Sequence, residues 1–398
     1  MSKTQTASGV APWPKVRLGD VCEIIGGGTP SIHEKAYYDG GIPWATVRDM
    51  GCRVIKKTER TISRLGLENS ATNIIKGGEL IISTHVGLGK VCYLAQDTAI
   101  NQDLKGVIPT TKELSRDYLY WWFVSIADYL VSKGTGATVK GVKLDFVKQL
   151  QLLLPPLAEQ KKIVEKVEKA LKRVDALKAQ FERMEKSAAD YFKAALAETF
   201  AAVKGEKVKL GDVCETISVG IVIRPTRYYT ANGIKAFRNT NIRACEVRDE
   251  DWVQVTDAAI KENPRCEVKM GDVVIARSGL PGVAAAITSA YDGFAAVDIL
   301  IAKPIANRAD SHYLAYAINT SGAQQQIKKM NNGVAQAHIG VNSVSSLLLT
   351  LPKMDSQKAI VATLDAAKAK SERMVAAARR SIGICGKMRK AILAEAFQ

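Results

Sequence analysis

The sequence lacks the signatures of the common metal, nucleotide and cofactor sites. None of its seven cysteines belongs to a C-x-x-C pair, and its four histidines do not lie near the cysteines at the spacing of zinc ligands. Residues 85–91 (HVGLGKV) lack the first glycine and the Ser/Thr of a P-loop, and Gly26-Gly27-Gly28 leads into a Thr-Pro loop instead of a helix. The Asn/Asp-Pro-Pro-Tyr/Phe motif of adenine methyltransferases is also absent. These absences leave few ways in which the chain itself would catalyse a reaction.

Long hydrophobic runs are absent too. No run approaches the roughly 20 apolar residues of a membrane span, and the N-terminal segment MSKTQTASGVAPWP lacks the apolar stretch of a signal peptide. The odd number and scattered positions of the cysteines favour reduced thiols over disulfides. We therefore expect a cytoplasmic protein without a membrane partner.

The composition is that of a globular protein with a positive excess. Its 398 residues are 47% apolar and 24% charged, and a chain of that length fits two or three domains. The 56 Lys and Arg against 40 Asp and Glu give a formal charge of +16. Such an excess favours a polyanion such as nucleic acid, or an acidic membrane surface. A basic surface without such a partner is the alternative.

The clearest feature is an internal repeat. Residues 16–25 (VRLGDVCEII) and 208–217 (VKLGDVCETI) are identical at eight of ten positions, at an offset of 192. Residues 154–164 (LPPLAEQKKIV) recur as 351–361 (LPKMDSQKAIV) at an offset of 197, and the later pentapeptide LAETF recurs as LAEAF. The chain is therefore two tandem copies of one module of roughly 190–200 residues.

Each copy has the same internal order. Short apolar runs broken by Gly, Pro and Asn predict strands joined by turns. One shorter helix is expected within each copy, over 115–132 with Ser115 as N-cap and over 311–330. The clearest predicted strand segments are Val16–Ile25, Leu80–Ser83, Val91–Leu94 and Leu150–Leu154.

Two long helices, over 157–200 and 355–397, carry the strongest periodicity. Their seam residues recur at alternating spacings of three and four, as in a heptad repeat. Because neither helix can bury its seam alone, we expect the two to pair; two unrelated surface helices are the alternative. The predicted seam residues are Ile163, Val167, Val174, Leu177, Phe181, Met184, Ile360, Leu364, Met374 and Met388.

These patterns divide the chain into four segments. Residues 1–156 and 205–352 are predicted to be globular domains, and residues 157–204 and 353–398 are predicted to be the two helical segments. The globular segments carry +7 of the net charge and the helical segments carry +9. Net charge alone therefore predicts weak DNA binding by the isolated chain.

One motif supports a catalytic alternative. Glu267 and Lys269 have the E-x-K spacing of a nuclease metal site, but the first copy has Ile74-Ile75-Lys76 at the aligned positions. A duplicated, basic chain with so few catalytic signatures fits a recognition protein better, in which two modules read two separated segments of a duplex. A metal-dependent nuclease using these two residues and a scaffold that binds only protein remain the alternatives.

The sequence resembles the specificity subunits of Type I restriction–modification systems. The resemblance is carried by the paired openings at 16–31 and 208–220, by Ile42-Pro43-Trp44 with its following Arg-Asp, and by the segments at 134–164 and 333–361. It covers nearly the whole chain, in order.

The resemblance implies an α/β fold with a pseudo-twofold internal repeat. Two mixed α/β target recognition domains, similar to those of adenine-N6 DNA methyltransferases, are separated by two long helices that form an antiparallel coiled coil. Each domain reads one half of a bipartite asymmetric site in double-stranded DNA, and the helices set the spacing and dock the modification subunits. The second copy has Lys353 and Ser356 where the first has Pro156 and Glu159, which raises the question of whether both ends bind partners equally.

The resemblance also implies which partners supply the chemistry. The specificity subunit is not catalytic and has no cofactor of its own. Two modification (methyltransferase) subunits bring S-adenosylmethionine, and restriction (translocase and endonuclease) subunits bring ATP and Mg.

The candidate DNA-binding residues follow from their chemistry. Lys and Arg neutralise phosphates, Arg reads guanine, and Asn and Gln read adenine. In the first domain the candidates are Arg48, Lys56, Lys57, Arg60, Arg64, Lys90, Thr135, Thr138, Lys140 and Lys143. In the second domain they are Arg224, Arg227, Arg238, Asn239, Asn241, Arg277, Gln336 and His338.

Overall fold

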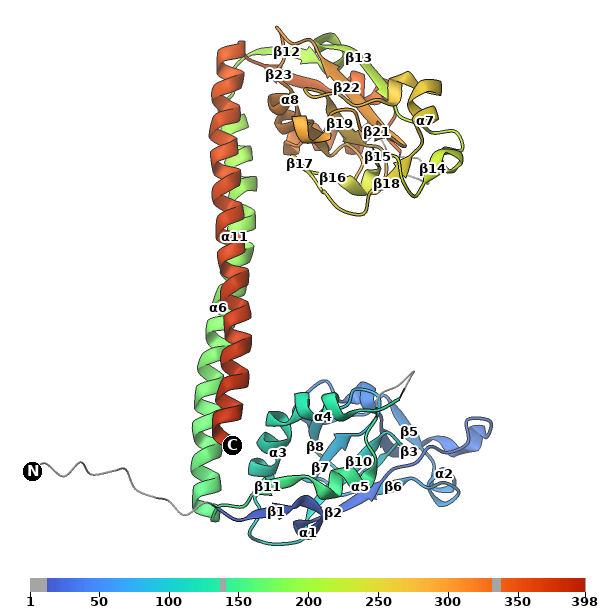
Figure 1. The fold of residues 1–398 in the computed structure, drawn as a ribbon, viewed down its shortest axis with the longest axis vertical. Coiled ribbons are helices and arrows are strands. Elements are labelled where there is room, and N and C mark those ends of the chain that lie inside the picture. The colour runs from blue at the N-terminus through green and yellow to red at the C-terminus, as the bar shows by residue number, and fades with distance from the viewer. Residues whose placement is uncertain (1–12, 137–140, 331–337, 398) are drawn as a thin grey trace, which may run out of the picture. The chain divides into compact units, whose positions relative to one another are not determined.

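The computed structural model describes residues 13–136, 141–330 and 338–397 (Figure 1). The chain divides into two compact units. The first holds the chain up to Phe181 and again from Arg380, and the second holds Glu182–Arg379. Each unit therefore joins a globular α/β body to one part of each long helix.

The body of the first unit contains two sheets, and each sheet is built from strands that lie far apart in the sequence. The larger has the order β2-β10-β7-β8-β4 and the smaller the order β5-β3-β9-β6. Pairing is antiparallel except between β4 and β8 and between β3 and β9. The strands of the larger sheet are β2 (Cys22–Gly26), β10 (Leu104–Pro109), β7 (Leu80–Ser83), β8 (Val91–Leu94) and β4 (Val54–Ile55). Those of the smaller are β5 (Arg60–Ile62), β3 (Tyr38–Ala45), β9 (Thr98–Ile100) and β6 (Asn73–Ile75).

Short helices and a two-stranded ribbon complete the first body. Strand β1 (Lys15–Arg17) pairs with β11 (Gln151–Leu153) just before the long helix. The main core packs aromatic residues of α3, among them Tyr118 and Phe123, against the larger sheet. The helices are α1 (Leu18–Val21), α2 (Arg64–Glu68), α3 (Arg116–Ser125), α4 (Ala127–Lys133) and α5 (Leu144–Gln149), with 3-10 turns η1 (Lys35–Tyr37) and η2 (Val47–Asp49).

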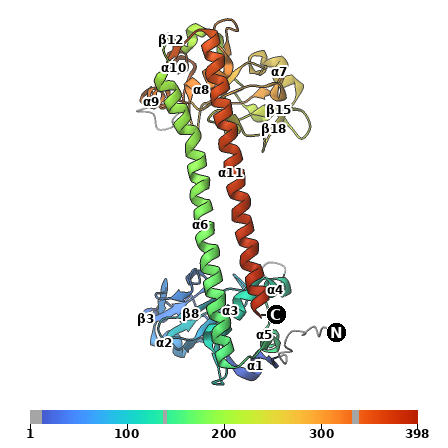
Figure 2. The same cartoon turned by 90° about the vertical axis from the view of Figure 1, so that its left-hand side faces the viewer.

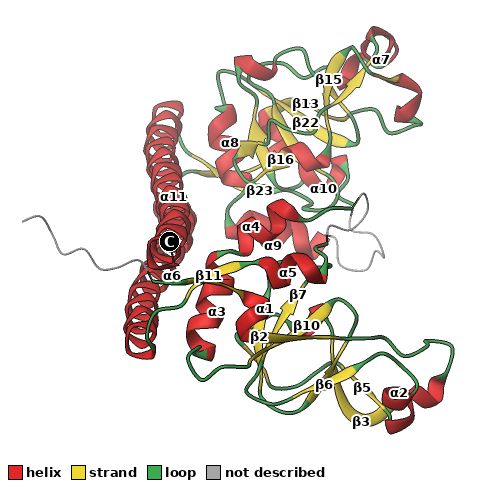
Figure 3. Cartoon of the chain, turned by 60° about the horizontal axis from the view of Figure 1, so that its bottom comes forward, coloured by secondary structure: helices red, strands yellow, loops and turns green. Residues whose placement is uncertain are grey.

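The second unit repeats this plan with small changes. Its sheets have the orders β13-β22-β19-β20 and β14-β18-β15-β21, and β12 (Glu206–Lys209) pairs with β23 (Leu348–Leu351). The strands are β13 (Cys214–Val219), β22 (Ile299–Pro304), β19 (Val273–Ala276), β20 (Ala284–Ala286), β14 (Tyr229–Thr230), β18 (Val253–Val255), β15 (Ile234–Phe237), β21 (Ala295–Ala296), β16 (Ile242–Arg243) and β17 (Glu246–Val247). The helices are α7 (Asp257–Glu262), α8 (Ser311–Ile318), α9 (Ser321–Met330) and α10 (Val341–Ser345), with 3-10 turns η3 (Leu210–Val213), η4 (Pro225–Tyr228), η5 (Asn239–Asn241), η6 (Pro264–Cys266) and η7 (Ser289–Tyr291). Helix α8 lies between the sheet β13-β22-β19-β20 and the long helix α11 (Met354–Phe397), as Figure 3 shows.

The internal repeat is visible in individual contacts. The buried amide of Gln160 accepts from the backbone N–H of Ser115 and donates to the carbonyls of Glu113 and Pro155, at 2.8, 2.7 and 2.7 Å. Gln357, 197 positions later, makes the same three bonds to Asp310, Arg308 and Pro352, at 2.8, 3.0 and 2.9 Å. A glutamine retained in both copies therefore fixes the start of each long helix to the preceding body.

The two long helices are confirmed as α6 (Leu157–Ala202) and α11 (Met354–Phe397). In the first unit, Asp175 of α6 pairs with Arg389 of α11 at 3.3 Å, and Phe397 packs on Tyr118. In the second unit, Ser371 donates to the carbonyl of Ala188 at 2.6 Å. In each unit an earlier part of one helix meets a later part of the other, so the helices pair antiparallel, as Figure 2 also shows.

The predicted seam is wrong at four of its ten residues. Leu177, Met184, Met374 and Met388 are 41%, 48%, 41% and 41% exposed. Val164 and Leu171 are buried although they were not predicted, and Glu185, Val375 and Arg389, each one residue after an exposed methionine, are partly buried. Val167, Val174 and Leu364 are buried as predicted, and Ile163, Phe181 and Ile360 are partly buried.

The physical reason is that two heptad registers share half of their positions. At the positions where the two registers differ, apolar character favours Met184 as the seam residue. The structure exposes Met184 and half-buries Glu185 instead. Its carboxylate accepts from Arg379 of α11 at 2.7 Å, so an ion pair occupies that place in the seam.

Three shorter predictions also need correction. The strand predicted over 16–25 is interrupted by α1, the helix over 115–132 is divided into α3 and α4, and the helix over 311–330 is divided into α8 and α9. Ser115 is the N-cap of α3, but its side chain makes no capping bond; its backbone N–H donates to Gln160. In the part of the chain that the structure describes, no helix is long and apolar enough to cross a membrane.

Candidate nucleic-acid interface

In each unit the loops that carry most candidate residues lie together. In the first unit the N–H of Val142 donates to the carbonyl of Thr84 at 2.9 Å, and Thr135 and Gly141 exchange two backbone bonds of 3.0 Å. A Cβ at Gly87 would lie 2.8 Å from a methyl of Val47 in η2. The loop after β3, the loop after β7 and the segment before α5 therefore form one surface, named here the first loop cluster (residues 46–60, 84–90, 134–136 and 141–143).

The second unit has an equivalent surface. The N–H of Ile339 donates to the carbonyl of Arg277 at 3.1 Å, and the N–H of Arg277 donates to the side chain of Asn239 at 2.6 Å. Gly89 and Gly282 hold φ angles of +88° and +87° in the matching loops, a conformation that glycine adopts without a steric cost. Residues 238–241, 277–283 and 338–341 form the second loop cluster.

The candidate cations differ in whether they already have a partner. Among the described candidate residues, seven exposed cations make no side-chain hydrogen bond or ion pair. One is Arg224, and the other six lie in the first loop cluster: Arg48, Lys56, Lys57, Arg60, Lys90 and Lys143. The N–H of Glu59 donates to Asp49 at 2.8 Å, which holds the Lys56–Arg60 segment beside η2. Unpaired exposed cations are the residues suited to phosphate contacts.

Other candidates are already engaged within their own unit. Arg64 is paired with Glu68 in α2, and Arg227 with Glu262 of α7 at 2.9 Å. Arg224 precedes η4, outside the segments that define the second loop cluster, and it is exposed. The exposed Thr135 and His338 stay candidates, while Thr138, Lys140 and Gln336 lie outside the described residues.

Three candidates of the second domain make hydrogen bonds or ion pairs within that domain. Asn241 is fully buried and donates to the carbonyls of Arg248 and Glu250, so its predicted base contact is wrong. Asn239 accepts from two backbone N–H groups and donates to the carbonyl of Asp298. The guanidinium of Arg277 pairs with Asp298 at 2.5 Å and is only 19% exposed.

Arg238 is also held, because it donates to the carbonyl of Asp251 at 2.7 Å. The physical reason for the error at Asn241, and for the internal bonds of Arg238, Asn239 and Arg277, is that Asn and Arg next to turns bond to backbone carbonyls as readily as to bases. A sequence pattern does not separate the two uses.

The catalytic alternative has little support in the geometry. Glu267 and Lys269 bind each other at 2.5 Å, which raises the pKa of the lysine through the hydrogen bond to the carboxylate. Within residues 13–136, 141–330 and 338–397, no group of three His, Cys, Asp or Glu side chains is placed to hold a metal ion.

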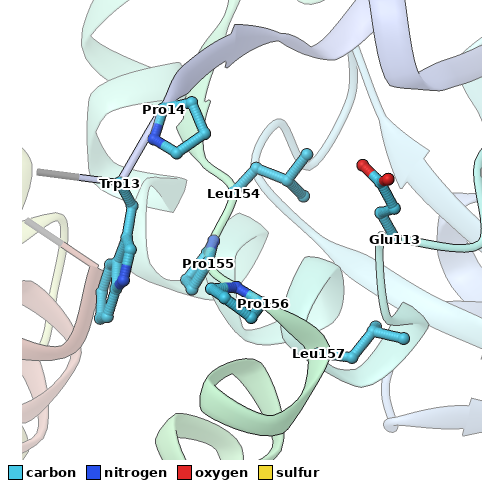
Figure 4. A pocket seen from close by; sticks show the side chains of 7 residues that line it. All are labelled: Trp13, Pro14, Glu113, Leu154, Pro155, Pro156 and Leu157. Atoms are coloured by element: carbon cyan, nitrogen blue, oxygen red, sulfur yellow. The ribbon is translucent and has the colours of Figure 1, made fainter. Parts of the chain in front are cut away.

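A cavity lies where the first body meets α6 (Figure 4). It has a volume of about 610 Å³ and is mostly apolar. Its walls are Trp13, Pro14, Glu113, Leu154, Pro155, Pro156 and Leu157. The second copy has Gly205 and Lys353 where the first has Trp13 and Pro156, so the apolar wall is not repeated there.

The comparison with protein families agrees with this duplicated plan. The family described as "Type I restriction modification DNA specificity domain" matches residues 11–186 and again residues 203–374. The chain belongs to this family. Its specificity subunits are non-catalytic, so the catalytic alternative has no support from the family either.

Curated relatives carry the same description. The chain is 28% identical over 186 residues to the MjaIX specificity subunit of Methanocaldococcus jannaschii, which is 46% of this chain and 43% of the relative. It is 29% identical over 159 residues to the EcoR124I/EcoR124II specificity subunit of Escherichia coli, 38% of this chain and 39% of the relative. The matched stretch thus spans less than half of each of these two relatives. A longer match, 20% identical, covers 97% of this chain and 85% of the EcoBI specificity subunit of Escherichia coli.

Solved structures share the fold of this specificity subunit. A chain described under "Structural basis underlying complex assembly and conformational transition of the type I R-M system" superposes with a TM-score of 0.74 at 19% identity, covering 98% of this chain and 99% of the other. The HsdS subunit from Thermoanaerobacter tengcongensis gives a TM-score of 0.56 at 19% identity, covering 97% of each chain.

Sequence reasoning missed residues that hold the body on the helices. Gln160 and Gln357 were detectable, because both copies retain glutamine at this position. Arg53, which stacks on three aromatic rings and pairs with Glu168 of α6, was not in the candidate set. The segment of the second copy that corresponds to Arg53 and its neighbours has a different composition, so a comparison of the two copies does not single out this arginine.

Proposed function

We propose that this specificity subunit reads DNA for a Type I restriction–modification complex, with each recognition domain binding one half of a bipartite asymmetric site. The observation that carries this is the duplicated specificity domain, matched at residues 11–186 and 203–374. The two loop clusters differ in their side chains, so the two half-sites are expected to differ in sequence. The unpaired cations of the first loop cluster supply phosphate contacts, which position the domain without specifying bases.

The partner subunits supply the chemistry in this proposal. Two modification subunits carry S-adenosylmethionine and transfer the methyl group, and restriction subunits use ATP and Mg. One docking place for a modification subunit is the apolar cavity at the start of α6, where Trp13 and Pro156 offer a surface for an apolar side chain. Lys353 replaces Pro156 in the second copy, so we expect modification subunits to make different contacts at the starts of the two long helices.

The paired helices set the distance between the half-sites in this account. A continuous helix has a fixed rise of about 1.5 Å per residue, so its length specifies a separation more narrowly than a flexible linker does. Support comes from the antiparallel ion pairs and hydrogen bonds of α6 with α11, found in each unit.

Reconstitution with the cognate modification subunit tests the proposal. The purified chain alone is expected to transfer no methyl group, and the assembled complex is expected to methylate one bipartite sequence in a randomised duplex library. Sequencing of the methylated positions gives both half-sites and the spacer. Methylation or cleavage by the chain alone supports an enzyme instead. Assembly without any sequence preference supports a protein scaffold.

A further inference from the structure

Arg53 sits at a junction between the first recognition domain and α6. Its guanidinium lies 5.7, 4.8 and 5.3 Å from the ring centroids of Tyr93, Tyr120 and Trp121. All three distances fall within the reach of a cation–π contact. The same guanidinium donates to Glu168 of α6 at 2.8 Å and to Asp117 of α3 at 3.3 Å.

The carboxylates of this junction are themselves shared. Glu168 also accepts from the indole N–H of Trp121 at 3.1 Å, and Asp117 accepts from the hydroxyl of Tyr93 at 2.7 Å. Arg53 thus joins three elements: the segment leading into β4, the helix α3 and the long helix α6. A planar guanidinium suits this place because it stacks on rings and donates in two directions at once.

The equivalent junction of the second unit is built differently. Tyr316 and Asp365 stand at the repeat positions of Trp121 and Glu168 and keep their hydrogen bond, at 2.5 Å. In the first unit the cation belongs to the body, whereas in the second unit it belongs to the long helix. Lys368 of α11 donates to the carbonyl of Cys245 at 2.7 Å.

The rings that surround the cation are absent from the second unit, where Tyr316 packs instead on Phe192 of α6, with 6.0 Å between the ring centroids. The β-sheet register and the α3/α8 correspondence place Ala286 and Ala315 at the positions of Tyr93 and Tyr120. A cavity of about 350 Å³ opens there, lined by both alanines together with Glu246, Asp365 and Lys368. Around the cation, one hydrogen bond to a neutral carbonyl and an open cavity replace two ion pairs and three ring contacts, and a single ring contact, between Phe192 and Tyr316, joins the helix to the body.

We propose that Arg53 is a positioning residue that fixes the first recognition domain on α6, and that the second domain is held on α11 by a looser junction. This rests on the proposed function, because a fixed orientation matters only if both domains bind one duplex. Arg53 touches no base in this account. It sets where along the duplex the first loop cluster falls, and so it narrows the spacer lengths that the complex accepts.

The test uses the full-length chain assembled with its modification subunit and a series of duplexes. The half-sites found in the reconstitution are separated by the native spacer or by one base pair more or less. Arg53→Ala is expected to raise the methylation of both altered spacers, relative to the native one, by about tenfold over the wild-type ratio, a factor in the range that loss of charge-assisted bonds produces. The half-site sequences are expected to stay unchanged, a result that mere loss of folding does not give.

Further variants keep the test decisive if Arg53→Ala folds poorly. Arg53→Lys retains the charge without the planar fork, and Glu168→Gln removes the anion on α6; both are expected to broaden the spacer preference by less. Lys368→Met, in the second unit, is expected to have the smallest effect. Arg17→Ala is the matched control, because Arg17 is paired with the neighbouring Asp20 on an exposed surface.

The outcomes separate two failures. If the wild-type complex methylates no bipartite site, the proposed function is wrong. If the wild type shows a narrow spacer preference that folded Arg53 and Glu168 variants retain in full, the positioning role is wrong while the proposed function stands.

Discussion

At the scale of single residues, what a cation does depends on whether a partner already holds it. Lys90 is exposed and unpaired among the described residues, whereas Arg277 is bonded to Asp298 and to the carbonyl of Ile339. Both residues were predicted to contact DNA from their residue type alone. Only the folded chain distinguishes them, because Asp298 and Ile339 approach Arg277 through tertiary structure.

This difference predicts opposite effects for two alanine substitutions. Lys90→Ala is expected to weaken DNA binding by the assembled complex equally for all sequences, and to reduce the slope of log affinity against log salt by about 1. Arg277→Ala is expected to lower the free energy of unfolding by about 1–3 kcal/mol, because it leaves Asp298 without its partner. Fluorescence anisotropy at several salt concentrations and urea unfolding measure the two effects. Lys162→Ala, which removes a helix-surface cation paired with Glu159, is the control. Reduced stability of Lys90→Ala with an unchanged salt slope contradicts the assignment.

The thiols give a prediction about pH. Burial raises the pKa of Cys22 and of Cys214 to about 12, whereas Cys52 is exposed. Since the thiolate is the reactive form, iodoacetamide at pH 8 is expected to modify Cys52 and to spare the buried thiols until the protein unfolds. A raised thiol pKa contributes stability below the unfolded value of about 8.5 and loses it as pH rises toward 12. Peptide mass spectrometry identifies which thiols are modified, and urea unfolding between pH 8 and pH 10 measures the loss of stability. Alkylation of Cys22 in the folded protein contradicts the assignment.

At the scale of elements, the repeat and its periodicity were readable, while the details of packing were not. The bounds of α6 and α11 agree with the predicted 157–200 and 355–397 because the heptad pattern is long and each helix follows a proline. The seam was misassigned at Met184 because apolar character favours it over Glu185, whose burial depends on Arg379 of the other helix. The interruption at Ile126 between α3 and α4 likewise has no glycine or proline to announce it.

The retained glutamines give the element-scale prediction. Gln160→Leu and Gln357→Leu are each expected to lower the free energy of unfolding by about 1–3 kcal/mol, because three backbone groups lose their partners at a buried site. Gln180→Leu, on an exposed part of α6, is the control and is expected to change little. Urea unfolding of the full chain measures all three. Equal stability of the Gln160 variant and the control contradicts the role given to these amides.

At the scale of the whole molecule, duplication is what the sequence shows most directly. The matching openings and helix starts predicted two modules, and the family matches each copy. The base contacts stay out of reach from sequence, because they depend on loop side chains that differ between the copies. The same holds for Arg53, whose ring contacts come from segments about 40 to 70 residues away in the chain.

Helix length gives a prediction about the spacer. Removing seven residues from α6 and the seven that pair with them in α11 keeps the heptad register and shortens the pair by about 10 Å, close to three base pairs of B-form DNA. Both half-site sequences are expected to persist while the spacer shortens by about three base pairs. Methylation of a duplex library with variable spacers reports the result. A site with its original spacer refutes the role of the helices as a ruler.

The central claim is that each recognition domain reads its own half of the site. Replacing residues 205–352 with the corresponding segment of another specificity subunit, and sequencing the positions methylated by the reconstituted complex, tests it most directly. The account predicts that one half-site changes to that of the donor while the other half-site stays the same. A chimera whose two half-sites both change, or whose site does not change at all, contradicts it.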